Sequence, residues 1–395
     1  MNPNEVRSLL EASGSTLGRF SGPELFWSQN VDLTNPVVVA PTRPLPLNRP
    51  LESIMVRLRG RVAVTVANYT AVNPEGFANL LQLFTLFGTH KDFGNLTTIK
   101  MSGATAYVWQ RLFQINGSET LTGSTGSTQT RAADPGRPYT STFAGTTAGS
   151  PYDFDIVWHI PLTPVMGEGQ DIKRQSTNFL YQPLHWADTL QAQLNFADKS
   201  GLGDPTGATV AFTAFGSGAG NPLLEIHLNY ALLGQFANRM RSGVVLRSEN
   251  VLSGFTSSAT FTQLQLLQKQ ITTNVMIKSG VAQTAGLTTG VSGFASLSDL
   301  QLDKTQIIVD NKPVRWNQSN LVSKAYYERM FNTIHPTGYF LQSFVDGQGA
   351  LLAYRGDGLQ GGSQFALFSD VTGVANARYS VVQEMVFGGP FPALR

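Results

Sequence analysis

The chain has 395 residues, of which 42% are hydrophobic and only 14% are charged, and its formal net charge is +2. This length exceeds the size at which a single hydrophobic core usually splits, so the sequence predicts two domains. The weak charge argues against general attraction to nucleic acid, and the absence of Cys excludes disulfides, thiol catalysis and thiolate metal sites.

The first residues carry the signals of one short helix followed by an arm. Asn2 is a helix cap, Pro3 occupies the first position and Gly14 follows the expected end, so a helix is predicted over 2–12. Residues 13–50 are rich in Pro and are expected to be an irregular, extended arm. The start does not resemble a signal peptide and no long apolar run follows, so synthesis in a host cytoplasm is expected.

Alternation of apolar and polar residues predicts half-buried strands through the first half. Arg57, Arg59 and Arg61 share one face of such a strand, with Val and Leu on the other face. Further alternating runs lie at 106–116, 153–161, 189–196 and 223–233. Residues 73–88 begin like a helix and continue as an apolar run, so this segment is ambiguous. Residues 117–150, rich in Gly, Ser and Thr, are expected to form a long surface loop.

A polar and basic stretch at 236–250 separates two β-rich halves. The second half is expected to hold one helix at 317–331 and an Asp346-Gly347 hairpin turn. Its strands are expected near 260–278, 305–310, 339–345, 350–354, 364–369 and 378–387. Each half ends in a long alternating strand that follows a Gly-rich loop and closes on Gly and Phe, which suggests a tandem duplication.

The sequence contains no catalytic signature that we recognise. The five His are far apart, and neither a GxSxG elbow nor a phosphate-binding loop is present, so no enzymatic role and no cofactor are predicted. Asp153, Asp155 and His159 share one strand face and are the one local candidate for a cation site. The competing interpretation is a polar outer face beside an apolar inner one.

The order of several segments resembles a known family. These segments are PEGFANLLQLF, DIVWHIPL, TLQAQLNFAD, GNPLLEIHLNYAL, TGYFLQSFVDGQG and ARYSVVQEMVF. In this order they resemble the double jelly-roll major capsid proteins of tailless, membrane-containing icosahedral bacteriophages, the tectivirus-like lineage. The resemblance covers roughly residues 50–390.

The resemblance implies an all-β fold of two tandem eight-stranded jelly-roll barrels with a short N-terminal helix and arm and few short helices. The implied parts are the helix and arm at 1–49, a first jelly roll at 50–236 and a second at 237–395. It also implies a structural protein of the virion capsid, whose homotrimers of pseudo-hexagonal outline tile an icosahedral shell over an internal membrane. Further expected partners are penton or minor cement proteins, without sequence-specific nucleic-acid binding.

Residues that contact a neighbouring subunit or face the membrane are expected in two places. Arg7 and Leu10 lie in the N-terminal helix, which the resemblance places on the inner side of the shell. Arg57, Arg59 and Arg61 form the sharpest charge feature. It is either an electrostatic contact with a neighbouring subunit, a lipid headgroup or nucleic acid, or a solvated strand face that discourages edge aggregation.

Two other functions stay open. A jelly-roll viral spike or lectin that binds carbohydrate or a receptor would need exposed aromatic side chains on one sheet, and Trp109, Trp158 and Tyr230 are candidates unless they lie in the core. A jelly-roll glycosidase or lyase would need paired carboxylates, which need not be close in sequence.

Overall fold

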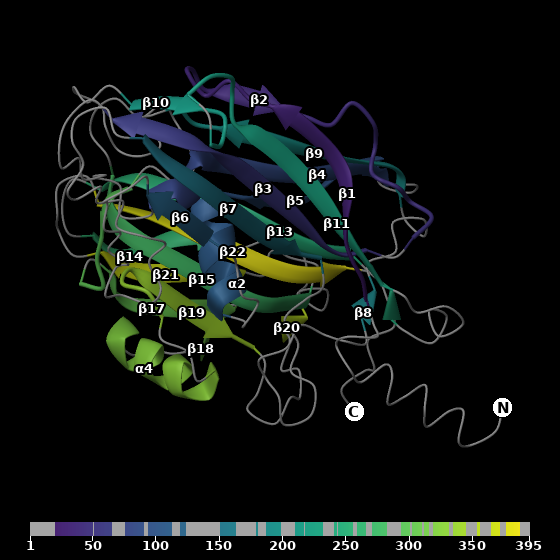
Figure 1. The fold of residues 1–395 in the computed structure, drawn as a ribbon. Helices are drawn as coiled ribbons and strands as arrows, with labels where there is room; N and C mark the ends of the chain where they lie inside the picture. Colours follow the sequence, from purple (N-terminus) through teal and green to yellow (C-terminus); the bar gives the residue numbers. More distant parts are fainter. Residues whose placement is uncertain are drawn as a thin grey trace, which may run out of the picture.

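The structure of the chain is a computed structural model (Figure 1). It describes residues 20–49, 51–64, 76–90, 94–112, 119–123, 151–162, 179–180, 187–198, 210–216, 218–231, 241–242, 244–255, 259–265, 271–282, 294–300, 302–309, 312–315, 319–331, 335–344, 354–355, 365–371 and 377–387. The expected N-terminal helix and the Asp346-Gly347 turn lie outside these residues. Among them, no helix combines the length and apolarity that a bilayer crossing requires.

The first half contains a six-stranded sheet, one face of which packs on the core. Its order is β1 (Phe20–Asn30), β11 (Leu223–Ala231), β3 (Leu51–Val64), β7 (Pro151–Pro161) and β6 (Glu119–Gly123), with β10 (Val210–Thr213) also paired to β3. In β3 the inward side chains Ile54, Val56, Leu58 and Val62 are fully buried, while Arg57 and Arg61 alternate with them. The two-residue period of the sequence therefore separates core from surface as expected.

A ten-stranded sheet faces this first sheet and continues into the second half. Along its path the order is β16 (Phe294–Leu297), β15 (Ile271–Ala282), β22 (Ala377–Phe387), β13 (Val244–Phe255), β5 (Gly94–Met101), β4 (Leu81–His90), β9 (Ala187–Phe196) and β2 (Val37–Val39); β19 (Tyr339–Ser343) and β20 (Tyr354–Arg355) also pair with β15. The two halves join where β13 runs parallel to β5, with Arg247 opposite Ile99. One sheet thus spans the whole molecule.

The remaining elements complete the second half and cover the core. A four-stranded sheet has the order β14 (Ala259–Gln265), β21 (Phe365–Val371), β17 (Leu302–Val309) and β18 (Lys312–Arg315), and β12 (Arg241–Ser242) pairs with β8 (Phe179–Leu180). The helices are η1 (Gly76–Leu80), α2 (Gly103–Leu112) and α4 (Asn320–Phe331). Figure 1 shows α4 on the outside of the second half, far from β2 and β10.

Large aromatic side chains tie the two layers of the first half together. Trp158 of β7 is fully buried, contacts Phe196 of β9 across the sandwich at 6.3 Å between ring centroids, and donates from Nε1 to the carbonyl oxygen of Ala78. Phe154, four positions earlier on the same inner face, lies 5.2 Å from the ring of Phe77 between ring centroids. The apolar face predicted for 153–161 is therefore core.

Most expected elements are confirmed. Strands occupy the predicted runs at 153–161, 189–196 and 223–231, and α4 lies within 317–331. The ambiguous segment 73–88 contains both alternatives in succession, the short helix η1 followed by strand β4. In the second half, the strands expected near 305–310 and 378–387 are β17 and β22. The all-β fold class is thus confirmed.

Three segments differ from expectation because their backbone finds a partner strand. The arm expected to be irregular at 13–50 contains β1 and β2, which pair antiparallel with β11 and β9. The polar stretch expected to be a linker at 236–250 already contains the start of β13. The loop expected at 117–150 contains β6, which pairs with β7. Each partner strand would otherwise have an unpaired edge. Pairing with a strand that is distant in the sequence cannot be predicted from the local composition of these segments.

The alternating run at 106–116 was expected to be a strand, and this is wrong: α2 occupies Gly103–Leu112. The side chains from Ala104 to Trp109 are all buried, so no polar face marks a helical period. Ser102 begins the helix by accepting the backbone N–H of Thr105 on its Oγ at 3.3 Å. A capping contact from β13, described below, completes this helix start.

We predict that Gly60→Ala destabilises the fold by about 1–3 kcal/mol, because an added methyl overpacks the core. Gly60 lies on the inner face of β3, and a Cβ there would lie 2.9 Å from both Phe154 Cζ and Pro222 Cβ. Thermal or urea unfolding measures the loss. Gly218→Ala is the matched control, since open space surrounds that position; equal unfolding midpoints for both variants would contradict the packing.

Candidate functional site

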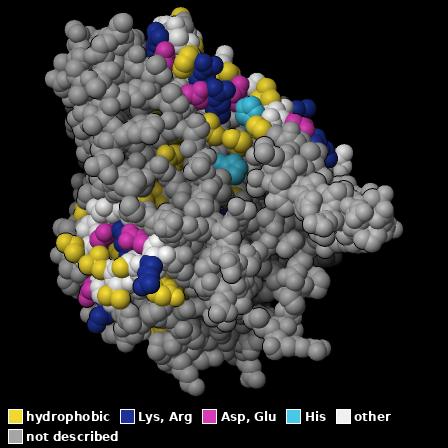
Figure 2. Space-filling view, turned by 60° about the horizontal axis from the view of Figure 1, so that its bottom comes forward, with side chains coloured by type: hydrophobic (Ala, Val, Ile, Leu, Met, Phe, Trp, Pro, Cys, Tyr) yellow, Lys and Arg dark blue, Asp and Glu magenta, His cyan; other side chains and the backbone are white. Residues whose placement is uncertain are grey.

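The outer surface of the first sheet carries a balanced ion-paired face. It consists of three arginines on β3 and three carboxylates on the neighbouring strands β7 and β11: Arg57, Arg59, Arg61, Asp153, Asp155 and Glu225. The strand register places Arg61 opposite Asp153, Arg59 opposite Asp155 and Arg57 opposite Glu225. Figure 2 shows these blue and magenta side chains interleaved with His on one surface. Cross-strand pairs of opposite charge stabilise such a sheet face.

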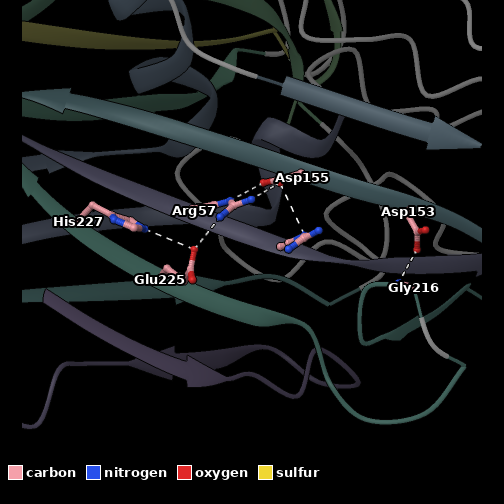
Figure 3. A network of polar contacts seen from close by, with 7 residues as sticks. Arg57, Asp153, Asp155, Gly216, Glu225 and His227 are labelled. Carbon is pink, nitrogen blue, oxygen red and sulfur yellow. Dashed lines mark hydrogen bonds and ion pairs between the residues drawn. The ribbon is translucent and has the colours of Figure 1, made fainter. Parts of the chain in front are cut away.

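Arg57 is the centre of this face (Figure 3). Its Nε donates to Asp155 Oδ1 at 2.8 Å and its Nη1 donates to Glu225 Oε2 at 3.0 Å. Hydrogen bonding to Asp155 raises the pKa of Arg57, against the opposing effect of burial. His227 Nε2 lies 3.4 Å from the same Glu225 oxygen. The central guanidinium therefore links all three strands.

The other two arginines, Arg59 and Arg61, also contact partners within the chain. Arg61 Nε donates to Asp153 Oδ1 at 2.7 Å, and this bond, followed by one from the backbone N–H of Gly216, lowers the pKa of Asp153 against its burial. The Arg59 guanidinium lies 3.6 Å from the centroid of the Phe215 ring, with its Nε 3.8 Å from Asp155. Three positive and three negative groups thus balance one another.

The candidate cation site was Asp153, Asp155 and His159. The structure places all three on the predicted face of β7, but both carboxylates accept from arginines. His159 instead contacts Ser53, with 2.7 Å between Nε2 and Oγ. Among the described residues, no three His, Asp or Glu side chains come together as a group that could hold a metal ion. These residues are therefore arranged as ion pairs and a hydrogen bond.

A second cluster, which sequence analysis missed, lies buried where the halves meet. We call Arg247, Glu249 and Glu384 the seam cluster. The side chains of Arg247 and Glu384 are fully buried and their Nη2 and Oε2 atoms lie 2.7 Å apart. Glu384 also accepts from Thr273 Oγ1 at 2.6 Å and from Asn274 Nδ2 at 2.8 Å. Within the second half, the buried carboxylate is therefore well solvated by donors.

Arg247 reaches from the second half into the first. Its Nη1 donates to the carbonyl oxygen of Pro161 at the end of β7, and its guanidinium lies 5.3 Å from the Trp109 ring centroid on α2. Burial lowers the pKa of Arg247, while the charge of Glu384 and the hydrogen bond to it oppose this effect. A charge this deep persists because its partner and acceptors are preorganised.

Glu249, on the same strand, caps the helix of the other half. Its Oε2 accepts the backbone N–H of Ser102 at 2.7 Å, and its Oε1 accepts from Thr105 Oγ1 at 2.9 Å. A carboxylate at a helix N-terminus satisfies unpaired donors and interacts favourably with the helix dipole. The seam cluster therefore binds α2 and β7 of the first half to β13 and β22 of the second.

The sequence carried only a faint signal of this cluster. Glu384 lies in the alternating strand expected at 378–387, where an acidic residue among buried positions would stand out. Arg247 lies in the stretch interpreted as a linker, so its burial was not expected. The other two residues assigned to contacts, Arg7 and Leu10, lie outside the described residues.

Comparison with known proteins identifies the fold. No protein-family model and no curated protein sequence matches the chain. Among solved structures, the major capsid protein of Sulfolobus Turreted Icosahedral Virus aligns with a TM-score of 0.55 and 14% identity, covering 94% of this chain and 99% of that chain. A capsid chain of the virus PBCV-1 aligns with a TM-score of 0.54 and 12% identity, covering 94% and 97%. The Faustovirus major capsid protein aligns at 0.52 and 8%, covering 92% and 90%.

These likenesses extend over almost the whole of each chain, so they are likenesses of the complete two-barrel arrangement. At such low identity they show the fold and no more. The expected double jelly roll is therefore confirmed, with the continuous ten-stranded sheet joining the two rolls.

We predict that Arg247→Met destabilises the protein by about 3–5 kcal/mol, since it leaves the Glu384 charge buried without its cation. The double variant Arg247→Met/Glu384→Leu should recover most of that loss, because it removes both charges. Urea unfolding measures each variant. Arg49→Met, which breaks an exposed pair with Glu24 and a ring contact with Tyr230, is the control and should cost about 1–2 kcal/mol. A single Arg247 variant as stable as this control would contradict the assignment.

We predict that protonation of His159 destabilises the fold between pH 6.5 and about 4. Burial lowers the pKa of His159 to about 4, below the ordinary value of 6.5. The unfolded chain therefore takes up this proton first, and the contribution is fully present above pH 6.5 and lost as pH falls through about 4. Unfolding free energies measured from pH 7 to pH 4 should fall less steeply for His159→Gln than for the unchanged protein. Parallel profiles would contradict the burial of a neutral imidazole.

Proposed function

We propose that this protein is a structural major capsid protein whose homotrimers, of pseudo-hexagonal outline, tile an icosahedral shell. The observation that carries this proposal is that the alignments cover nearly all of both chains. Two capsid proteins align over 97–99% of their own length with 94% of this chain. Three copies of two similar barrels supply six similar edges, which suits a hexagonal lattice.

The construction of the fold supports a wall-building role. One continuous sheet and a buried seam cluster join the two barrels, so bending between them would break strand pairing and expose paired charges. With only 14% charged residues, the chain also has little charge to desolvate when its sides are covered. Permanent assemblies bury large, relatively apolar areas of this kind. We assign the protein no catalytic role and no cofactor.

We further propose the tectivirus-like lineage of tailless bacteriophages with an internal membrane as the setting. The order of sequence segments supports this proposal. In that setting, we expect penton and minor cement proteins as the other capsid partners and Arg7 and Leu10 as membrane-facing contacts. We place the boundary between the two jelly rolls near residue 237, between β11 and β13.

The ion-paired face is a proposed subunit contact of limited strength. Arg57 and Arg61 are already bound within the chain, so a neighbour meets a neutral, prearranged surface. Polar complementarity at such a surface fixes how neighbouring subunits align and adds little to the affinity between them.

The rival function in carbohydrate or receptor binding finds less support. Trp109 and Trp158 are fully buried and Tyr230 is 5% exposed, so the aromatic residues that could have formed a sugar platform are core. Phe215 is more exposed, but the Arg59 guanidinium covers its ring.

Light scattering coupled to size exclusion tests the proposal. Purified protein is expected to run with three times the chain mass, and negative-stain images should show particles of hexagonal outline. A monomer at every concentration would contradict the capsid role. Binding to a glycan array by such a monomer would favour the rival function.

A further inference from the structure

Helix α4 exposes several apolar side chains to solvent and buries three polar ones against the protein, beside the fully buried Tyr327. The buried positions include Asn320, Ser323 and Lys324, which are 1%, 2% and 6% exposed. On the opposite side, Leu321 and Val322 are 47% and 55% exposed. A surface helix of an isolated protein normally shows the reverse arrangement.

Polar contacts fix this orientation, so α4 cannot turn its apolar side inward. Asn320 Nδ2 donates to the carbonyl oxygen of Leu302 at 2.7 Å. Lys324 Nζ lies 3.0 Å from both carboxylate oxygens of Asp299 and donates to the carbonyl oxygen of Pro336 at 2.8 Å. Turning the helix would break these bonds and bury unpaired groups, which is costly. The outward apolar side is thus built into the fold.

A neighbouring turn enlarges the apolar surface. We define the α4 patch as Leu300, Leu321, Val322 and Tyr326, of which Leu300 is 73% and Tyr326 is 47% exposed. Leu300 follows Asp299, the partner of Lys324, so the turn and the helix lie side by side. Figure 2 shows apolar side chains gathered at the lower left, on the part of the surface where α4 lies.

The charges around the patch favour a protein partner over a membrane. Asp303, Lys304 and Arg329 are exposed and Glu328 is half-buried, so α4 and the strand β17, whose Lys304 pairs with Ser319 just before α4, carry two acidic and two basic residues outside the patch. A helix that binds the surface of an anionic bilayer instead carries an excess of Lys and Arg. The balanced surround matches the polar rim of a protein interface with an apolar centre.

We infer that the α4 patch is the apolar centre of the contact between neighbouring copies of this chain in the trimer; this inference rests on the proposed function. A standard interface buries about 800 Å² on each partner, and four large side chains, each about half exposed or more, suit the centre of such an area. Because a three-fold ring needs heterologous contacts, the patch packs against a different surface of the next copy.

The double variant Leu321→Asp/Val322→Asp tests this inference in the full chain. Both positions lie in the first turn of α4, where acidic side chains favour the helix, so the fold should survive. Light scattering over a dilution series should show trimer association weakened at least a hundredfold, with circular dichroism and the unfolding midpoint near those of the unchanged protein. Val38→Asp is the matched control, because Val38 is an apolar residue of similar exposure, 61%, on the terminal strand β2; this variant should remain trimeric.

A second variant guards against local unfolding of α4. Leu300→Asp lies outside the helix and should also weaken trimers, by at least tenfold. If the unchanged protein is trimeric and both the Leu321→Asp/Val322→Asp and the Leu300→Asp variants remain trimeric, the α4 contact is refuted while the capsid role stands. If the unchanged protein is monomeric, both fail. A third outcome is that the unchanged protein binds phosphatidylglycerol vesicles and the α4 variants, still trimeric, do not. This result would overturn the inference in favour of a membrane contact.

Discussion

The fully buried ion pair of Arg247 and Glu384 is the interaction on which the two-barrel arrangement depends. A sheet that runs from one barrel into the next must bury the backbone and side chains at the crossing. Here the crossing strand β13 carries two charged side chains that form hydrogen bonds with the other half. Arg247 donates to the carbonyl oxygen of Pro161, and Glu249 accepts the backbone N–H of Ser102. A shift between the barrels that separated these charges from their partners would destabilise the protein, because an unpaired charge in a low-dielectric interior is costly. The seam therefore specifies one relative position of the barrels.

A rigid double barrel explains where the polar chemistry of the chain is found. The outer face of the first sheet holds as many arginines as carboxylates, and they satisfy one another within the chain. The half-buried His159 has its pKa lowered by desolvation to about 4, so its imidazole is neutral at physiological pH. These groups stabilise and shape surfaces. We therefore assign function to the exposed faces, and the outward apolar side chains of α4 form one such surface among the described residues.

Much of the fold could be predicted because alternation directly reports a half-buried strand. The runs around Trp158, Leu194 and Leu228 show this, and all three side chains lie in the core. Prediction failed where long-range partners decide. The side chains of α2 are buried as far as Trp109, and the helix receives its cap from Glu249, 147 residues beyond Ser102. The arm becomes β1 only because β11 offers a free edge.

The candidate site divides in the same way. The sequence placed Asp153, Asp155 and the β3 arginines on outward faces, and the structure agrees. Their pairing depends on strand register, which a single sequence does not encode visibly. The seam cluster brings together positions 137 residues apart, so only the assembled fold shows that Arg247 and Glu384 meet.

Differential scanning calorimetry tests most directly whether the seam makes the two barrels a single structural unit. The account predicts one cooperative transition whose calorimetric enthalpy equals its van't Hoff enthalpy, because neither barrel can unfold without leaving seam charges unpaired. Two separable transitions, with one barrel unfolding while the other persists, would contradict it.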